Sequence, residues 1–402
     1  MDLKGLMSGI AVVIDDELDQ QSSASVEGTA DLIRDIVARF ETEWSTPFYR
    51  SSAMPADSIW DNLLKTASFV LLDWRLWKHD ATELEAYGVE RNLEFFQRAK
   101  DYSVPVFIFS NDDPDNIAYK LEPLYDEESL KKSFVFIQRK SELLANGSLN
   151  LDAVETWMMN NASVYTLKTW DHMLGRARKD LFDAMYGRSA DWPRVFWREY
   201  LKDGVDPSAA LTDLINDSLR GRMQANVFED EILSDDGNDP QVPMEDLHAL
   251  FSATSFLDSV PDHEVRCGDL FETDDGTFLL NIRPDCDCIP RDGVTLDEVE
   301  LYCITGTAME PSELRNKYRS RGGFLVERVN QAIVFAAGDG RSIDFDFKQL
   351  RIEKFETWKS QRVGRLLHPY VTRIQQRYAL FLQRQGLPRI PGEAIPPAAG
   401  GT

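Results

Sequence analysis

The chain has 402 residues, of which 68 are acidic and 44 basic, so its formal net charge is −24. This length predicts two or three domains with substantial cores, and a composition of 43% hydrophobic and 28% charged residues excludes an intrinsically disordered protein. Residues 1–350 carry 35 basic and 65 acidic groups, a net charge of −30, whereas residues 351–402 carry 9 basic and 3 acidic groups. Because nucleic-acid affinity comes mainly from basic groups, the acidic body argues against general nucleic-acid binding, except for a local contact through the C-terminal helix.

The sequence has no signature of a membrane or secreted protein. No apolar run approaches the ~20 residues that span a bilayer, and the N-terminal segment MDLKGLMSGIAVVIDDE lacks the layout of a signal peptide. The four cysteines do not form the pattern of a secreted disulfide framework. We therefore expect a cytoplasmic protein without membrane partners.

Residues 1–145 predict an α/β domain with a doubly wound, parallel, five-stranded sheet. Short apolar runs alternate with stretches of helical periodicity, which is typical of parallel strands covered on both faces. The expected strands are residues 10–14, 47–50, 69–72, 104–109 and 134–137, and the expected helices include residues 26–44 and 88–100.

Residues 146–235 predict a helical connector, with helix starts at Trp192-Pro193 and at Asp206-Pro207. Its aromatic residues recur at helical spacing, so we expect most of them in the core of a helical bundle. They are Trp157, Trp170, Phe182, Tyr186, Trp192, Phe196, Trp197 and Tyr200. The acidic, turn-rich segment 228–240 marks the end of this part.

Residues 241–390 predict a C-terminal α+β module with a small antiparallel sheet or barrel, because short strand-like segments alternate with Asp-Gly turns. Residues 362–385 predict one long amphipathic helix, whose arginines we expect to pair with the acidic surface. Residues 391–402, rich in Pro, Gly and Ala, predict a disordered tail.

The cysteines all lie in the C-terminal module, and a histidine lies close to them in the sequence. Four of the five side chains would suffice for a tetrahedral zinc site, but no Cys-x₂-Cys pair is present. Buried thiols are therefore the favoured interpretation, and catalysis by Cys286 lacks an identifiable base. The five residues are His263, Cys267, Cys286, Cys288 and Cys303.

Polar residues stand at the ends of the predicted parallel strands. Ligands of such sheets bind outside the carboxyl ends of the strands, so these side chains are expected to share one site. Three carboxylates there would hold Mg²⁺, one carboxylate would accept a phosphoryl group, and a hydroxyl and a lysine would contact the phosphate. The residues are Asp15, Asp16, Asp73, Ser110 and Lys140.

This arrangement resembles the receiver domain of bacterial response regulators. The motifs that carry the resemblance are VVIDDE (12–17), FVLLDWRLW (69–77), VFIFSN (106–111) and FIQRK (136–140). The resemblance implies that Asp15 and Asp16 bind Mg²⁺, together with the phosphoacceptor Asp73. Ser110 would be the switch hydroxyl and Lys140 the strand-five lysine, with Arg139 as the alternative for that role.

The chain is similar to diverged receivers of bacterial phage-defence gene clusters. It differs from the usual pattern in the residues after Asp73, which are Trp-Arg-Leu-Trp, and in an insertion around residues 20–27. A phosphatase of the haloacid type would need an aspartate at position 75, which is Arg75. A Mg²⁺-dependent nuclease is disfavoured because the acidic surface would repel a phosphate backbone.

These observations predict a phosphorylation-dependent signalling protein that accepts a phosphoryl group on Asp73 from a histidine kinase or phosphotransfer protein. It would be a phosphoacceptor rather than a turnover enzyme, and it would control a C-terminal output module with a possible protein effector. One alternative is a non-catalytic scaffold with a degenerate receiver, whose site is closed by Trp74 and Trp77. Another is an effector that binds nucleic acid or a partner through the C-terminal module.

Overall fold

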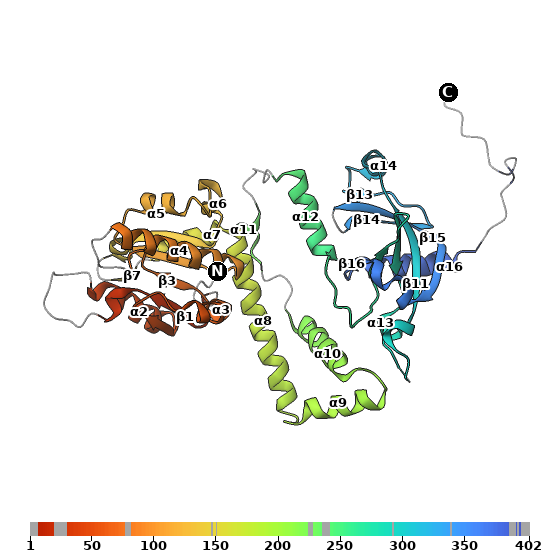
Figure 1. The fold of residues 1–402 in the computed structure, drawn as a ribbon, viewed down its shortest axis with the longest axis horizontal. Helices are drawn as coiled ribbons and strands as arrows, with labels where there is room; N and C mark the ends of the chain where they lie inside the picture. The colour runs from red at the N-terminus through yellow and green to blue at the C-terminus, as the bar shows by residue number, and fades with distance from the viewer. Residues whose placement is uncertain are drawn as a thin grey trace. The chain divides into compact units, whose positions relative to one another are not determined.

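Figure 1 shows the computed structural model of the chain. It describes residues 7–19, 30–76, 82–145, 148–149, 151–223, 228–234, 242–291, 293–337, 340–385, 391 and 394. The chain divides into two compact units, one formed by residues 1–190 and 215–239, the other by residues 191–214 and 240–402. The division at residue 239 falls within the acidic, turn-rich segment 228–240.

The first unit is built on a five-stranded sheet with the order β2-β1-β3-β4-β5, and every neighbouring pair is parallel. The predicted α/β class with a parallel five-stranded sheet is confirmed. The strands are β1 (Ala11–Ile14), β2 (Phe48–Ser51), β3 (Val70–Leu72), β4 (Val106–Ser110) and β5 (Val135–Arg139). This order reverses direction between β1 and β3, the point at which doubly wound sheets bind ligands.

Helices cover both faces of this sheet (Figure 1). The helices of this unit are α2 (Ala30–Glu43), α3 (Asp57–Thr66), α4 (Thr82–Asp101), α5 (Pro114–Leu121), α6 (Glu127–Lys131), α7 (Asp152–Met159), α8 (Ala162–Tyr186) and α11 (Asp230–Leu233). The short hairpin of β6 (Leu144–Ala145) and β7 (Ser148–Leu149) follows the sheet, and 3₁₀ turns span Asp16–Asp19 and Lys140–Glu142. The expected helix at residues 26–44 is α2, although residues 26–29 lie outside the described part.

Alternate side chains of the strands enter two separate cores, as the pleat requires. Val12 and Val70 point to the face where Trp60 of α3 and Phe95 of α4 pack edge to face. The opposite face is packed against α2 and α7, through buried residues that include Ile33, Ile36, Phe40, Val154 and Met158. Burial on both faces explains why these strands read as continuous apolar runs in the sequence.

Helix α8 attaches to the same unit through a buried lysine. Lys168 is 6% exposed, and its ammonium group donates a hydrogen bond to the carbonyl oxygen of Ser68, just before β3. Burial lowers the pKa of Lys168 to about 8. The charged form of this lysine therefore opposes folding at neutral pH.

We expect this lysine to make stability depend on pH. Between about pH 8 and the ordinary value of 10.5 the unfolded chain binds more protons at this site, so the free energy of unfolding rises with pH across that interval. Relative to a Lys168→Met variant, the wild type should gain up to about 3 kcal/mol from pH 8 to 10.5 in urea titrations. Parallel pH curves for the two proteins would contradict the assignment.

The second unit is built on a seven-stranded sheet with the order β14-β15-β11-β10-β9-β16-β8, and its ladders are antiparallel. This confirms the antiparallel sheet expected for the C-terminal module. Its strands are β8 (Phe256–Leu257), β9 (Asp269–Glu272), β10 (Thr277–Asn281), β11 (Glu300–Ala308), β14 (Gln331–Ala337), β15 (Arg341–Lys354) and β16 (Arg362–Leu366). A separate hairpin joins β12 (Tyr318–Arg319) and β13 (Phe324–Leu325).

The second unit also contains several helical segments. They are α9 (Trp192–Lys202), α12 (Met244–Ser255), α13 (Asp285–Cys288), α14 (Pro311–Lys317), α15 (Phe355–Trp358) and α16 (Tyr370–Gln383), with 3₁₀ turns at Leu296–Glu298 and Lys359–Gln361. Helix α10 (Pro207–Arg222) begins in this unit and ends in the first. The helix starts predicted at Trp192-Pro193 and Asp206-Pro207 are confirmed.

The long helix expected over residues 362–385 is wrong in its first part. Residues 362–366 form strand β16, which pairs with β9 and β8, and the helix α16 begins only at Tyr370. Gly364 has φ +152°, and a Cβ there would lie 2.2 Å from the Leu257 carbonyl oxygen, so this close approach of two strands requires glycine. The arginines are spaced as they would be on one face of a helix, but backbone pairing with two distant strands makes residues 362–366 a strand. The predicted disordered tail, residues 391–402, lies outside the described residues except for Pro391 and Ala394.

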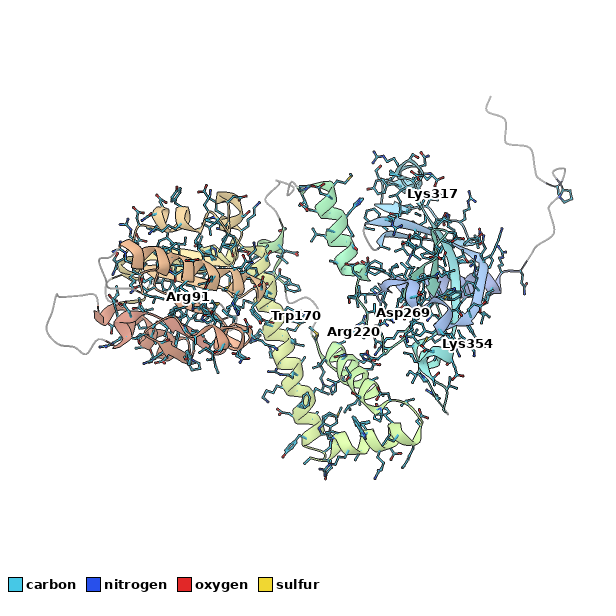
Figure 2. The ribbon with its side chains drawn as sticks, viewed as in Figure 1. Arg91, Trp170, Arg220, Asp269, Lys317 and Lys354 are labelled. Carbon is cyan, nitrogen blue, oxygen red and sulfur yellow. The ribbon has the colours of Figure 1, made fainter. Side chains whose placement is uncertain are left out.

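The arginines of β16 form a buried ion-pair network. Asp269, labelled in Figure 2, is 0% exposed and lies 2.8 Å from Arg362 Nη2 and 2.5 Å from Arg365 Nε. Arg365 also contacts Glu264, and Arg266 joins Glu264 to Asp213 of α10. The expected pairing of the C-terminal arginines with acidic groups is thus seen at Arg362 and Arg365, and also in the contacts of Arg373 and Arg377 with Glu327.

Removal of Asp269 should leave two arginines without their buried counter-charge. We expect Asp269→Ala to lower the free energy of unfolding by about 3–5 kcal/mol. The control Asp297→Ala removes an exposed partner of Lys359 and should cost less than about 1 kcal/mol. Equal effects of the two substitutions in chemical denaturation would show that the network contributes no more than a surface pair.

Most aromatic residues of the middle region do not form the core that their spacing predicted, although Trp157 packs on Phe107 and Phe136 in the core of the first unit. Trp170 (Figure 2) and Trp197 are 42% and 43% exposed, Phe182 and Tyr186 are exposed, and α9 buries none of its residues. Trp192, Phe196 and Tyr200 pack mainly on one another along α9. Helical periodicity identified the helices correctly but did not show what covers their apolar faces. In the described part of the chain no helix combines the length and apolar character needed to cross a membrane.

Candidate functional site

The predicted site residues meet at the carboxyl ends of the parallel strands. Asp15 directly follows β1, Asp73 follows β3, and Ser110 is the last residue of β4. Lys140 follows β5 and opens a 3₁₀ turn. The backbone N–H of Asp73 donates to the Ile14 carbonyl at 2.9 Å, which continues the ladder and places Asp15 and Asp73 side by side.

Lys140 is the centre of the site. Its side chain is 0% exposed, and Nζ lies 2.7 Å from Asp15 Oδ2, 2.7 Å from Asp73 Oδ2 and 3.1 Å from Glu17 Oε2. Burial lowers the pKa of Lys140, but Asp73 and Asp15 outweigh it, so the pKa is raised above its ordinary value. The ammonium group is therefore charged at physiological pH.

Arg139, the alternative to Lys140, points elsewhere. Its guanidinium lies 3.3 Å from Asp113 Oδ2, and its side chain is 45% exposed. Arg139 is the last residue of β5, whereas Lys140 begins the 3₁₀ turn after the strand, and only Lys140 lies within ion-pair distance of Asp15 and Asp73. The structure brings Lys140 to them.

Both oxygens of the Asp73 carboxylate have defined partners. Ser110 Oγ donates a hydrogen bond to Oδ1 at 2.8 Å, and Lys140 Nζ donates to Oδ2 at 2.7 Å. The backbone N–H of Arg75 adds a third hydrogen bond to Oδ1 at 3.1 Å. Asp73 is 7% exposed, so the carboxylate is held in one orientation and largely shielded from water.

The acidic groups at this edge exceed the basic ones. Asp15, Asp16, Glu17 and Asp73 supply four carboxylates, and Lys140 supplies one ammonium group. Asp15 is 1% exposed, and burial, together with the charge of Asp73, raises its pKa to about 6. Lys140 counters this rise without abolishing it, so burial is the main reason that Asp15 is harder to ionise than a free aspartate.

Three of these carboxylates fit a divalent cation. One oxygen each from Asp15, Asp16 and Asp73 lies within 4.8 Å of the others. Asp15 Oδ2 is buried and, although 2.7 Å from Lys140 Nζ, accepts no hydrogen bond of normal geometry from the described residues. Oxygen ligands at one edge of a site, with room for water, are the set that Mg²⁺ prefers. The acidic cluster is thus compatible with Mg²⁺.

Sequence reasoning did not assign Glu17 to the site. Its backbone N–H donates to Asp15 Oδ1 at 2.9 Å, and its carboxylate reaches Lys140. The position of Glu17 two residues after Asp15 in the same acidic run was the available signal. The 3₁₀ turn that follows β1 folds the run back on itself, which brings Glu17 to the lysine.

Trp74 is buried against helix α4. It is 3% exposed, its ring centroid is 6.2 Å from that of Phe96, and its carbonyl accepts a hydrogen bond from Asn92 at 3.0 Å. These contacts attach the segment after β3 to α4. Trp77, the second residue expected to close the site, lies outside the described residues. Arg75 pairs with Asp112 at 2.7 Å and is largely exposed.

The cysteines do not form a metal site. Cys267, Cys288 and Cys303 are buried, Cys286 is exposed, and all four are free thiols. Burial raises the pKa of Cys288 to about 12 and raises those of Cys267 and Cys303 as well. Among the described residues the one group of three or more ligating side chains is Asp15, Asp16 and Asp73. The favoured interpretation, that the cysteines are buried thiols, is correct for three of the four.

Comparisons with known proteins add nothing to this geometry: no protein-family model matches the sequence, and no curated protein matches it either.

The acidic cluster predicts a measurable affinity for Mg²⁺. We expect Asp16→Asn to weaken Mg²⁺ binding about tenfold or more, because it removes a half-buried ligand without disturbing the partners of Lys140. The control Asp113→Asn alters an exposed carboxylate of the same edge and preserves a good helix cap, so its affinity should match the wild type. Calorimetric titration at constant ionic strength measures both. Absence of Mg²⁺ binding, or equal loss in the two variants, would remove the site.

Proposed function

We propose that this protein is a receiver-like signalling protein that accepts a phosphoryl group on Asp73. The observation that carries the proposal is the environment of one carboxylate: Asp73 is hydrogen-bonded by a hydroxyl through one oxygen and by an ammonium group through the other. A carboxylate held in this way beside two further acidic residues has the parts needed for an aspartyl phosphate. The donor would be a phosphohistidine of a histidine kinase or phosphotransfer protein.

In the proposed reaction an oxygen of Asp73 forms a P–O bond as the P–N bond of the phosphohistidine breaks. The electron pair of that bond returns to the imidazole nitrogen, which takes up a proton. Mg²⁺, held by Asp15, Asp16 and Asp73, would supply positive charge against the phosphoryl oxygens. The chain's own residues orient the acceptor oxygen and exclude water, which protects the mixed anhydride from hydrolysis.

Ser110 and Lys140 would report the modification. Both now contact Asp73 directly, and the new phosphoryl oxygens would compete for the same hydroxyl and ammonium donors. Lys140 would then leave Asp15, and Ser110 would draw the end of β4 with it. A change of partners at two strand ends is the kind of local charge event that biases a switch. The role is that of a phosphoacceptor, without turnover of a separate substrate.

Labelling by a small phosphodonor tests the proposal. Wild-type protein incubated with acetyl phosphate and Mg²⁺ should gain one phosphoryl group by intact mass, with the label on the peptide that contains Asp73. Asp73→Asn should take no label and remain folded by circular dichroism, because the amide keeps the shape of the side chain. Asp113→Asn should label as the wild type does. An unlabelled wild type at saturating Mg²⁺ would refute the phosphoacceptor role.

A second candidate function follows from the burial of the site residues. Lys140 is completely buried, and Asp73 is 7% exposed, so the ion pairs already satisfy much of the centre. Such a centre would also serve a non-catalytic scaffold in which the receiver-like fold is kept for docking. In that case the wild type would take no label, and Lys140 would matter for stability alone.

A further inference from the structure

The second unit contains a polar cavity that has no part in the proposed phosphoacceptor site. Its volume is about 250 Å³, and it lies on the face of β11, β15 and β14. It is lined by Thr305, Gly306, Thr307, Arg328, Asn330, Gln331, Asp344, Asp346 and Gln349. Lys317, labelled in Figure 2, reaches the same place from the end of α14 and donates a hydrogen bond to Gln331 Oε1 at 3.2 Å.

The register of the three strands explains why this face is polar. Thr305 of β11 lies opposite Asp346 of β15, which lies opposite Gln331 of β14, and the pleat points these three side chains to one side. The side chain between Asp344 and Asp346 on β15, Phe345, points to the opposite face of the sheet and packs in the core. A Cβ on Gly306 would come within 2.6 Å of the Phe345 ring. The row of polar side chains is therefore fixed by tight packing on the other face.

Thr305 lacks a partner for its hydroxyl. The residue is 7% exposed, it lines the cavity, and its Oγ1 makes no hydrogen bond to any described residue. A buried hydroxyl without a partner costs free energy, and native proteins rarely leave one. The cavity is the side from which a ligand group would supply the missing bond.

Two carboxylates next to Thr305 each have one oxygen engaged by the protein. Asp344 Oδ2 accepts a hydrogen bond from the Gln331 amide, and Asp346 Oδ1 accepts from Asn330 Nδ2 at 2.9 Å. The hydrogen bonds of the described residues thus hold each carboxylate in place through one oxygen. Among the described residues none donates a hydrogen bond to the second oxygens, Asp344 Oδ1 and Asp346 Oδ2.

We propose that this cavity binds a guanidinium group. Planar guanidinium presents several N–H donors in a fork and matches carboxylates better than any other biological cation. At the cavity Asp344 and Asp346 stand against Arg328 in the lining and Lys317 beside it. Recognition would therefore rest on directed hydrogen bonds to the carboxylate oxygens rather than on net charge. The cavity has no aromatic residue in its lining, which disfavours the stacking that sugars and bases use. The guanidinium would come from a free small molecule or from an arginine side chain of a peptide.

Titration of the full chain with matched probes tests the proposal. The peptide-like probe is Nα-acetyl-arginine N-methylamide, the free probe is L-arginine, and the uncharged control is Nα-acetyl-citrulline N-methylamide. We expect saturable calorimetric binding of at least one arginine probe and at least about tenfold weaker binding of citrulline. Tighter binding of the capped probe would assign a peptide source, and tighter binding of free arginine a small molecule. No saturable binding of either arginine probe, or equal binding of citrulline, would overturn the proposal.

Substitutions then locate the binding. Asp344→Asn and Asp346→Asn should each weaken the arginine probe about tenfold, whereas Asp258→Asn, an exposed carboxylate of the same unit outside the cavity, should change it less than twofold. Equal losses in all three variants would show non-specific attraction to an acidic surface. Because these amide variants preserve side-chain shape, their fold is checked by unchanged thermal midpoints.

Thr305→Val separates binding from structure. It removes a hydroxyl that makes no bond within the fold, so the thermal midpoint should stay the same or rise. Binding of the arginine probe should weaken several-fold, because the ligand loses one acceptor. A variant that is destabilised and binds as tightly as the wild type would contradict the role assigned to this hydroxyl.

Discussion

One ammonium group, Nζ of Lys140, lies within ion-pair distance of three carboxylates and is inaccessible to solvent. An isolated buried charge costs many kcal/mol, so the residues that neutralise this lysine must arrive together. Asp15 comes from the end of β1, Asp73 from the end of β3, and Glu17 from the turn after β1. The strand order and register of the whole sheet are therefore coupled to the position of a single nitrogen atom.

The same constraint links the fold to its proposed chemistry. Parallel strands direct all their carboxyl ends to one edge, and the order β2-β1-β3-β4-β5 places the ends of β1 and β3 next to each other. Apolar cores cover both faces of the sheet, and the polar site residues lie at this edge. There the acidic groups outnumber Lys140. Burial, with the charge of Asp73 as a smaller cause, raises the pKa of Asp15 to about 6, so a further cation would favour its ionised form.

Much of the first unit was predictable because its signals are local. Continuous apolar runs marked the strands, and polar residues directly after them marked the site, so Asp15, Asp73 and Ser110 needed no tertiary information. The choice between Arg139 and Lys140 did need it, since the end of β5 and the 3₁₀ turn after it decide which residue faces the carboxylates. Glu17 was missed because its role depends on the fold of a short 3₁₀ turn.

The second unit was less predictable because its structure depends on contacts between distant residues. Arg362 and Arg365 recur at a helical interval, yet pairing of their backbone with β9 turns that segment into a strand. The cavity around Thr305 arises only from the register of three strands, and Thr305 itself carries no motif. The spacing of residues along the sequence indicates local structure, but it does not indicate which face of a helix or strand a distant segment will cover.

The central claim is that Lys140 neutralises part of a carboxylate centre whose acidic cluster can hold a further cation. The most direct measurement is the free energy of unfolding of Lys140→Met, by urea titration, without and with Mg²⁺. We predict a loss of about 3–5 kcal/mol without Mg²⁺ and partial recovery at saturating Mg²⁺, because the ion replaces the missing charge. A loss below about 1 kcal/mol, or a loss that Mg²⁺ leaves unchanged, would contradict the account.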